Sequence, residues 1–393
     1  MIRISKWMLA LFLFLAVSSV VNAQDFSALS QDVRSYLFDP QIHPGLKSGK
    51  IEPEYGDALV YAGSYICHRA MTGEDVSKDE LAIADAMVKN YETYLDQFEK
   101  NPITSFQNMD TMMHTYIGIG GIYFASFYEP DARKQAVIAR YLDDFKLFAR
   151  HPGILYYYPI QPYGPGTVLF GLASFYLQYP LSFPDSARAG EFKKIGLGLV
   201  KKLDKNLWSE TEQKYLFDLV PGYDFTYAYT NAVAIQALIR AFYLTGDKLY
   251  YDRAVLVLSA MERDLYRPEY QGYLSAEDNQ AYQRQYQKFN PLYNQQYMPL
   301  STLNYIVYGY LLVYEASGFQ EDEFLQKAER GINFPKNYLW DQKGRVQHHL
   351  AAGRISEEKD YCAGCNFQLL YNIFLIDQAR KKNPIALLKS REP

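Results

Sequence analysis

The chain has 393 residues, of which 49% are hydrophobic, and its formal net charge is −4. This composition is that of a globular protein, and the negative charge argues against nucleic acid as a partner, because nucleic-acid binding needs a basic surface. Tyrosine is unusually common, with 37 residues against 23 Phe and 3 Trp. Because tyrosine covers apolar surface and keeps a hydroxyl for hydrogen bonding, this excess suits a wet cavity with aromatic walls.

The first 23 residues have the pattern of a cleavable signal peptide. Basic Arg3 and Lys6 precede a mostly apolar run from Trp7 to Val21, and Val21-Asn22-Ala23 ends in the small-residue pattern that signal peptidase reads. The run is short for a bilayer span, although a leader that stays attached as an anchor is the alternative. We therefore expect a bacterial protein whose mature chain, residues 24–393, is soluble and either periplasmic or secreted.

Two kinds of segment with helical periodicity alternate along the mature chain. One kind is apolar nearly all round, and its members begin near Gly56, Asn108, Tyr163, Thr226, Met298 and Tyr361. The other kind has a charged face and covers residues 26–38, 78–99, 131–149, 186–205, 247–264 and 320–333. A helix that is apolar all round is buried, whereas a striped helix is half exposed.

This alternation predicts an all-α, single-domain (α/α)6 toroid, with six inner helices surrounded by six outer ones. An open helical solenoid is the alternative. The inner segments are too apolar for the open concave surface that a solenoid presents, and the repeat of about 50 to 70 residues is long for a tetratricopeptide or ankyrin array.

The connections between segments predict where the function lies. Inner-to-outer connections are short, whereas the outer-to-inner connections near residues 98–108, 149–163, 205–226, 265–297 and 333–361 are long. Because the two helices of a hairpin run antiparallel, all the long loops collect at one end, where the inner helices begin. Long loops on a rigid scaffold usually bind ligands, and helix N-termini favour anionic groups. That end is the predicted working face.

Three long loops, near residues 206–218, 264–274 and 338–349, read as aromatic residue, polar turn and alternating residues, which predicts short β-hairpins. The third contains Leu339-Trp340-Asp341 followed by Gly344, and the second contains the run Gln271-Gly-Tyr-Leu-Ser-Ala-Glu-Asp.

In these motifs the chain resembles the six-hairpin (α/α)6 toroids, which include N-acylglucosamine 2-epimerase-like proteins, several glycoside hydrolases and uronate-processing enzymes. Those proteins place a Leu-Trp-Asp-x-x-x-Gly hairpin before an inner helix. The second run is similar to the Gly-Gly-Phe-Tyr-Ser-Ala-Glu-Asp hairpin of a thioredoxin-fused epimerase-like family, with Gln271 in place of the first Gly. The resemblance covers most of the chain as architecture and implies sugar chemistry without fixing the reaction.

Asp110 and His114 are the first catalytic candidates. They lie at the mouth of the second inner helix and, being four residues apart, share one helix face. A carboxylate beside an imidazole can act as general acid and base. The structural alternative is an acid that complements the helix dipole and a histidine packed in the core. The toroid resemblance implies catalysis, because an acidic residue at such a mouth is often catalytic in related hydrolases.

The fourth mouth and the longest loop supply further candidates. Tyr227 and Asn231 are expected on one helix face towards the ring axis, with Tyr227 as an acid and Asn231 as a binding residue. Asp224 is expected to bind substrate or to cap the helix. Glu277 and Asp278 are adjacent carboxylates that could divide acid and base roles, with Glu277 the catalytic candidate, or they are solvated loop acids.

Four more residues are predicted to bind the substrate. Tyr163 begins the third inner segment, and Tyr297 ends an aromatic stretch that resembles a lid. His348 and His349 should point to opposite faces of a strand, so that only one faces the cavity, and we take His349. Arg354 follows in the same loop.

Cys362 and Cys365 form a Cys-x-x-Cys pair at the start of the sixth inner segment. Three alternatives stay open, namely a local disulfide, a zinc site completed by His349 or Asp360, and small core residues. We expect no metal and no cofactor. No phosphate loop, Ser-His-Asp signature or His-Glu-x-x-His motif is present.

The sequence thus predicts an exported carbohydrate-active enzyme, either hydrolase, lyase or epimerase, that acts on a sugar or uronate by acid–base catalysis in a Tyr-rich cavity. The expected partner is a carbohydrate or another small acidic ligand. Two alternatives remain: a non-catalytic toroid that binds carbohydrate or protein, and a zinc-dependent toroid enzyme.

Overall fold

The computed structural model describes most of the chain from residue 25 onward. The described residues are 25–48, 56–100, 120–123, 125, 126, 128, 129, 131–151, 164–216, 225–277, 296–351, 353–356 and 361–385. The predicted leader, 1–23, lies outside these ranges. Within them, every helix is too short or too polar to span a bilayer.

Five apolar segments form helices where the sequence predicts them. These are α4 (Gly56–Met71), α10 (Gly164–Ser182), α12 (Ala228–Thr245), α15 (Leu300–Ala316) and α17 (Ala363–Arg380). From Ala228 to Ala241, every residue of α12 except Gln236 is buried. That burial on all sides is what an inner position requires.

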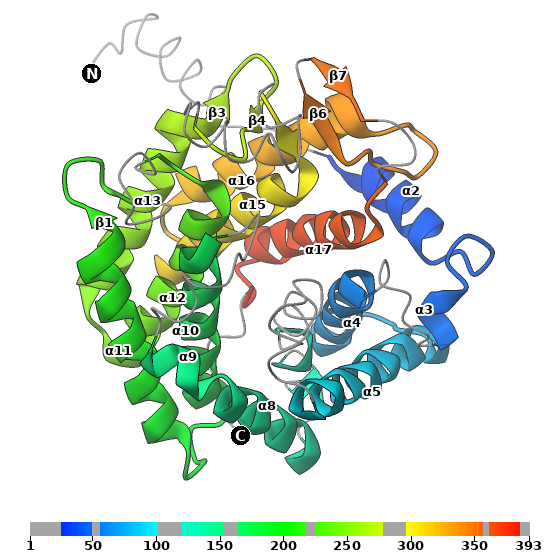
Figure 1. Ribbon diagram of the computed structural model, residues 1–393. Helices are drawn as coiled ribbons and strands as arrows, with labels where there is room; N and C mark the ends of the chain where they lie inside the picture. The colour runs from blue at the N-terminus through cyan, green and yellow to red at the C-terminus, as the bar shows by residue number, and fades with distance from the viewer. Residues whose placement is uncertain are drawn as a thin grey trace, which may run out of the picture.

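These helices form a closed ring (Figure 1). Helix α10 packs on α12, α12 packs on α15, and α15 packs on α17. The last helix, α17, then packs on the first, α4. The helical residues near 120–128 lie between α4 and α10. A Cβ atom at Gly121 would lie 3.0 Å from Val60 of α4, and the Tyr123 hydroxyl donates to the Phe175 carbonyl of α10 at 2.8 Å.

The amphipathic segments form the outer layer. They are α2 (Ser27–Leu37), α5 (Lys78–Lys100), α8 (Ala132–Asp144) with α9 (Lys146–Arg150), α11 (Ala189–Leu207), α13 (Lys248–Leu265) and α16 (Asp322–Phe334). Four of them, α5, α11, α13 and α16, pack on the inner helix that precedes them, and α2 packs on α17. The four-residue helix α3 (Gly45–Ser48) contacts α5, and one π-helical turn, η4 (Pro335–Leu339), extends α16. The two predicted layers are confirmed.

Two of the three predicted hairpins form as expected. Strand β1 (Trp208–Ser209) pairs with β2 (Lys214–Tyr215), and β3 (Tyr266–Arg267) pairs with β4 (Gly272–Tyr273), both antiparallel. Gln271, which replaces a Gly of the resembling motif, has a φ of +56°. This left-handed conformation favours glycine, which explains why that motif carries one.

The third hairpin differs from the prediction. It has a single bridge, between Trp340 and Val346, and the chain then enters a three-stranded sheet. There β6 (His349–Ala351) lies between β5 (Met298–Pro299) and β7 (Arg354–Ile355). The loop therefore pairs both with itself, through β6 and β7, and with the loop before α15, through β5.

The described parts of three long loops, those before α12, α15 and α17, meet at one end of the ring, as predicted. Leu216, after β2, bridges to Thr226, and the next residue, Tyr227, bridges to Ala276, after β4. The Ser275 N–H donates to the Tyr297 carbonyl at 3.0 Å, which extends the chain of contacts to β5. Short extended segments thus join neighbouring mouths into a belt around the working face.

Two asparagines tie this belt to the inner helices, and we call each an asparagine clamp. Asn231 lies four residues after the N-cap of α12, and its side-chain amide pairs with both the N–H and the C=O of Tyr215, each at 3.0 Å. Asn366, four residues after the N-cap of α17, pairs with Val346 in the same way at 2.9 and 2.8 Å. Both asparagines are wholly buried.

Candidate active site

A cavity of about 110 Å³ lies on the ring axis. It is lined by α4, α10, α12, α15 and α17 and by residues 120 and 121. Four tyrosines contribute to its wall, namely Tyr61, Tyr305, Tyr308 and Tyr371. The polar lining residues are Ser64, Gln236, Arg240, Gln368 and Asn372.

The sequence predicts a Tyr-rich cavity, but none of the described residues that line this one is among its predicted site residues. Its polar residues are spaced three or four apart within otherwise apolar helices, as in Gln236 with Arg240, and this spacing places them on one helix face. That polar stripe was the available signal. The stripe is hard to recognise in the sequence because the other faces of the same helices are also buried, so these helices have no exposed polar face with which to contrast it.

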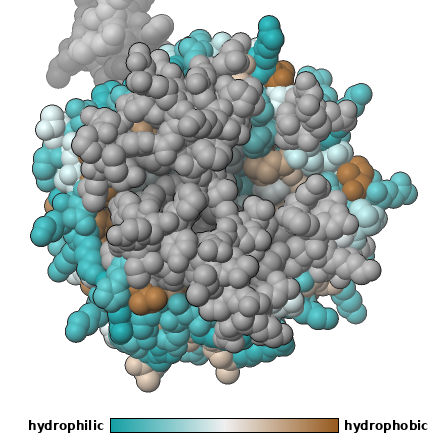
Figure 2. All heavy atoms as spheres, in the orientation of Figure 1, coloured by the Kyte–Doolittle hydropathy of each residue, from teal (hydrophilic) through white to brown (hydrophobic). Residues whose placement is uncertain are grey.

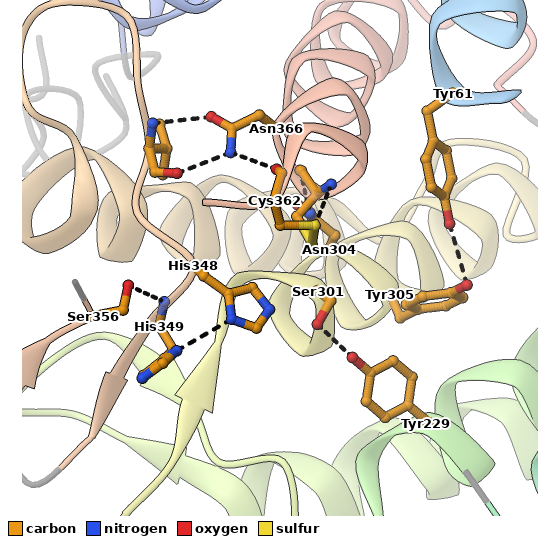
Figure 3. Close-up of a disulfide and its surroundings, with 12 residues drawn as sticks. Tyr61, Tyr229, Ser301, Asn304, Tyr305, His348, His349, Ser356, Cys362 and Asn366 are labelled. Carbon is orange, nitrogen blue, oxygen red and sulfur yellow. Dashed lines mark hydrogen bonds between the residues drawn. A yellow bond between two sulfur atoms is a disulfide. The ribbon is translucent and has the colours of Figure 1, made fainter. Parts of the chain in front are cut away.

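The tyrosine hydroxyls of this region bond to one another and to small hydroxyls (Figure 3). The Tyr61 and Tyr305 hydroxyl oxygens are 3.2 Å apart, and the Tyr229 hydroxyl donates to Ser301 Oγ. Burial raises the pKa of Tyr229 and of Tyr308. Both phenols therefore stay protonated at neutral pH. Tyr308 lines the cavity, where a phenol O–H suits a ligand rich in hydroxyls, whereas Tyr229 uses its O–H on Ser301.

His68 supports the cavity wall from behind. Its Nδ1 lies 3.0 Å from the hydroxyl of Tyr371, and its Nε2 lies 3.3 Å from the carbonyl oxygen of Pro384. Because a carbonyl can only accept, Nε2 carries the proton and Nδ1 accepts from Tyr371. Burial lowers the pKa of His68 to about 4, so the ring is neutral under ordinary conditions.

We predict that His68 makes the protein lose stability in mild acid. The unfolded chain takes up a proton on His68 near pH 6.5, whereas the folded chain does so only near pH 4. The contribution is therefore constant above pH 6.5 and falls between these two values, by about 3 kcal/mol in all. Urea unfolding of the wild type and of His68→Asn from pH 7.5 to 4.5 measures it. Parallel curves for the two proteins would contradict the assignment.

Cys362 and Cys365 are joined by a disulfide at the mouth of α17 (Figure 3). Cys362 is the N-cap of α17, and its sulfur accepts a hydrogen bond from the Cys365 N–H at 3.1 Å. Of the three alternatives for this pair, the structure contains the local disulfide. His348 approaches it closely enough that one ring nitrogen and both sulfurs lie within 4.8 Å of one another. Paired in a disulfide, the sulfurs are not thiolates and do not ligate metal.

The strand pattern predicts that the side chains of His348 and His349 point to opposite faces, but in the structure the two rings lie together. Their Nδ1 atoms are 3.2 Å apart and their ring centroids 5.3 Å. The reason is that β6 begins at His349, so His348 precedes the strand and its alternation. His349 is buried and packs against the ring of Tyr297 at 5.0 Å between centroids. The structure thus brings two predicted binding residues together, whereas Arg354 is exposed on β7.

Glu277 lies in an ionic network at the mouth of α12. Its Oε2 accepts from the Thr226 N–H at 2.9 Å and from the Lys214 ammonium at 3.1 Å. Lys214 also bonds to Asp264 at 3.3 Å, and the Thr226 hydroxyl donates to the same Asp264 oxygen at 2.5 Å. The Glu277 side chain is 38% exposed, so it remains accessible to a ligand as well as serving this network.

Tyr227 and Asn231 do not line the described cavity. Tyr227 is wholly buried as the N-cap of α12, and Asn231 uses both of its N–H donors on the carbonyls of Tyr215 and Tyr227. These contacts give Asn231 a role in the scaffold, and the predicted roles of both residues in catalysis or binding stay predictions. Asp110, His114, Tyr163, Asp224 and Asp278 lie outside the described residues.

On the face drawn in Figure 2, the described surface is mainly polar. Figure 2 shows that the described residues at the rim of this face are mostly hydrophilic. The exposed large hydrophobic side chains belong to different elements and are scattered: Ile42, Tyr128, Leu147, Leu249 and Ile355. Single exposed hydrophobic residues of this kind are ordinary.

Several solved structures with a similar arrangement of helices are carbohydrate-active enzymes. An unsaturated glucuronyl hydrolase from Bacillus sp. GL1 superposes with a TM-score of 0.59 and 12% identity, covering 93% of this chain and 98% of its own. The chain has the (α/α)6 toroid fold.

Two further toroids show how many reactions this fold hosts. A family 76 α-mannanase from Bacteroides thetaiotaomicron superposes at 0.59 with 12% identity, covering 91% of this chain and 98% of its own. A sugar epimerase from a ruminal bacterium superposes with a TM-score of 0.58 and 10% identity, covering 91% of this chain and 98% of its own. No protein-family model matches the chain, and no curated protein matches it in sequence.

Proposed function

We propose that this toroid is an exported bacterial enzyme, periplasmic or secreted, that acts on a sugar or uronate by acid–base catalysis. The observation that carries the proposal is the axial cavity, whose wall alternates tyrosine rings with amide and hydroxyl groups. Aromatic faces pack against sugar rings, and convergent polar groups bind hydroxyls, which is the usual composition of a small-ligand site.

The proposed acid–base groups are Asp110 and His114 first, with Tyr227 and Glu277 behind them. Glu277 is supported by its place at the mouth of α12, where its carboxylate is partly exposed. Hydrolysis, elimination and epimerisation all need proton transfer at an oxygen or carbon of the sugar, so one acid–base constellation serves each. Similarly folded enzymes act on glucuronyl and mannan substrates and epimerise sugars.

A panel of neutral oligosaccharides, uronic acids and unsaturated uronides, scored by thermal shift and then by product analysis, tests the proposal. We expect at least one sugar to raise the melting temperature at millimolar concentration and to be converted on incubation. If no sugar in the panel stabilises the protein, the proposed function is wrong.

A non-catalytic, carbohydrate-binding toroid is the second candidate. One observation favours it, since no carboxylate is found among the described residues that line the cavity. Such a protein would be stabilised by a sugar that it leaves intact. Chromatography of the bound sugar after long incubation separates the two candidates.

A further inference from the structure

Arg240 is a buried cation on the cavity wall. It lies in α12, it is 7% exposed, and neutral groups, the Tyr308 hydroxyl among them, form hydrogen bonds with its guanidinium. Nε donates to Gln178 Oε1 at 2.7 Å, and Nη1 donates to the Gln236 carbonyl at 2.9 Å. Both acceptors are neutral. Among the described residues no carboxylate forms an ion pair with this guanidinium.

The hydrogen bonds fix where the guanidinium lies. Gln178 is itself held by a bond from its amide nitrogen to Ser182 Oγ at 3.0 Å, so its oxygen is oriented towards Arg240. Gln236 is one helical turn nearer the mouth, and side chains tilt towards the N-terminus of their helix. The bond to Gln178, in the C-terminal half of α10, places the guanidinium at the inner end of the cavity.

A buried charge without a counter-charge is unfavourable, because it loses its hydration and gains no ion pair in return. The nearest compensation comes from dipoles. Tyr308 borders the same cavity, accepts a hydrogen bond from Arg240, and is influenced electrostatically by both Arg240 and Glu315. Such a cation, pre-oriented and facing a cavity, is the arrangement expected of a site that receives an anion as its ligand.

We propose that Arg240 binds the carboxylate of an acidic sugar at the inner end of the cavity, an inference that rests on the proposed function and narrows its substrate class to uronic acids. Arg240 is the only cationic side chain among the described lining residues, which matches a monoanion rather than a doubly charged phosphate. Guanidinium and carboxylate are both planar and pair through two parallel hydrogen bonds. The sugar ring then lies between Arg240 and the Tyr61–Tyr305 pair.

The test compares D-glucuronate with D-glucose by calorimetry, in the wild type and in Arg240→Gln. We expect Arg240→Gln to weaken glucuronate binding at least about tenfold and to leave glucose binding unchanged. It should also keep or raise the melting temperature of the unliganded protein, because it removes an uncompensated charge. Arg253→Gln is the matched control, since it breaks an ion pair with Asp204 on the outer layer and should leave the affinity for glucuronate unaltered.

A second variant, Gln236→Glu, keeps the inference testable if Arg240→Gln does not fold. It places a carboxylate one turn from Arg240 and should stabilise the free protein while abolishing the preference for glucuronate. Equal binding of glucuronate and glucose, or unaltered glucuronate binding in both variants, would overturn the inference and leave the proposed function standing. Preference for glucose 6-sulfate over glucuronate would overturn the assignment of a carboxylate.

Acetate provides an arm that does not depend on sugar binding. If no sugar binds but acetate stabilises the wild type and not Arg240→Gln, the proposed function fails and the carboxylate site stands. If neither acetate nor any sugar binds, both fail.

Discussion

An Asp110→Asn variant is expected to lose at least about 100-fold in kcat, because positioned general acids and bases contribute roughly that much or more. Asparagine has nearly the same shape and caps a helix as well as aspartate does, so the substitution removes proton transfer and charge while preserving a capping role. The measurement is kcat on the sugar found by the screen, accompanied by thermal melting.

The control for this variant is Asp252→Asn on the outer helix α13, where Asp252 is about half exposed and pairs with Lys248. That change should alter neither turnover nor stability appreciably. If Asp110→Asn instead lowers the melting temperature and keeps turnover, Asp110 is a structural residue and catalysis lies elsewhere, with Glu277 the next candidate.

Replacing Lys214 by Met is expected to lower the free energy of unfolding by about 3 kcal/mol, since breaking a buried ion pair leaves charge without compensation. The Lys214 side chain, in β2, is 3% exposed and bonds to Asp264, at the end of α13, and to Glu277, in the loop that follows α13. Lys248→Met is the matched control. Its pair with Asp252 is solvent-exposed and should contribute less than about 1 kcal/mol.

The pH dependence of the free energy of unfolding gives a second test of the Lys214→Met prediction. Burial acts to raise the pKa of Asp264, but hydrogen bonds from Arg263 and Thr226 and the charge of Lys214 hold that pKa below its usual value. A carboxyl with a lowered pKa stabilises the folded chain above its ordinary pKa, and this contribution is lost as pH falls through the folded value. Lys214→Met should therefore flatten the loss of stability below about pH 4. An unchanged acid limb would show that Arg263 and Thr226 suffice without Lys214.

The layered fold was predictable because the sequence of each helix indicates how much of that helix is buried. The inner helices are apolar on every face and the outer ones on one, so a single pass along the sequence separates them. The third hairpin was less predictable, because His349 pairs with Pro299, fifty residues earlier. Pairing over such a distance leaves no local pattern in either strand.

The candidate site was predicted only in part. Tyr227 and Asn231 were expected to face the axis from their spacing, but the amide of Asn231 is used by Tyr215, a residue of the preceding loop. Helical spacing predicts which residues share a helix face, but it does not predict which neighbouring element that face contacts. The role of Arg240 was not predictable for a related reason. The sequence of one helix does not indicate whether a carboxylate of another helix lies next to its single cationic side chain.

The abundance of tyrosine has two sources. Some tyrosines line the cavity, but others bond to acids of the outer layer, as Tyr273 and Tyr310 do with Glu262 at 2.6 and 2.8 Å and Tyr251 does with Glu321 at 2.8 Å. A buried phenol needs a partner for its hydroxyl, and a carboxylate at the helix edge supplies one. The composition therefore reports how the two layers are held together as much as what the cavity binds.

Closure of the ring has a consequence for how the chain acquires its structure. His68 of α4 and Tyr371 of α17 are 303 residues apart in sequence, so the first inner helix lacks its neighbour until the last one exists. Contacts over such separations form late and slowly, because a long loop must close first. A chain emerging from the ribosome thus cannot complete its core before α17 has been synthesised. Until then, the apolar surface of α4 that α17 covers is exposed, which makes the incomplete chain prone to aggregation.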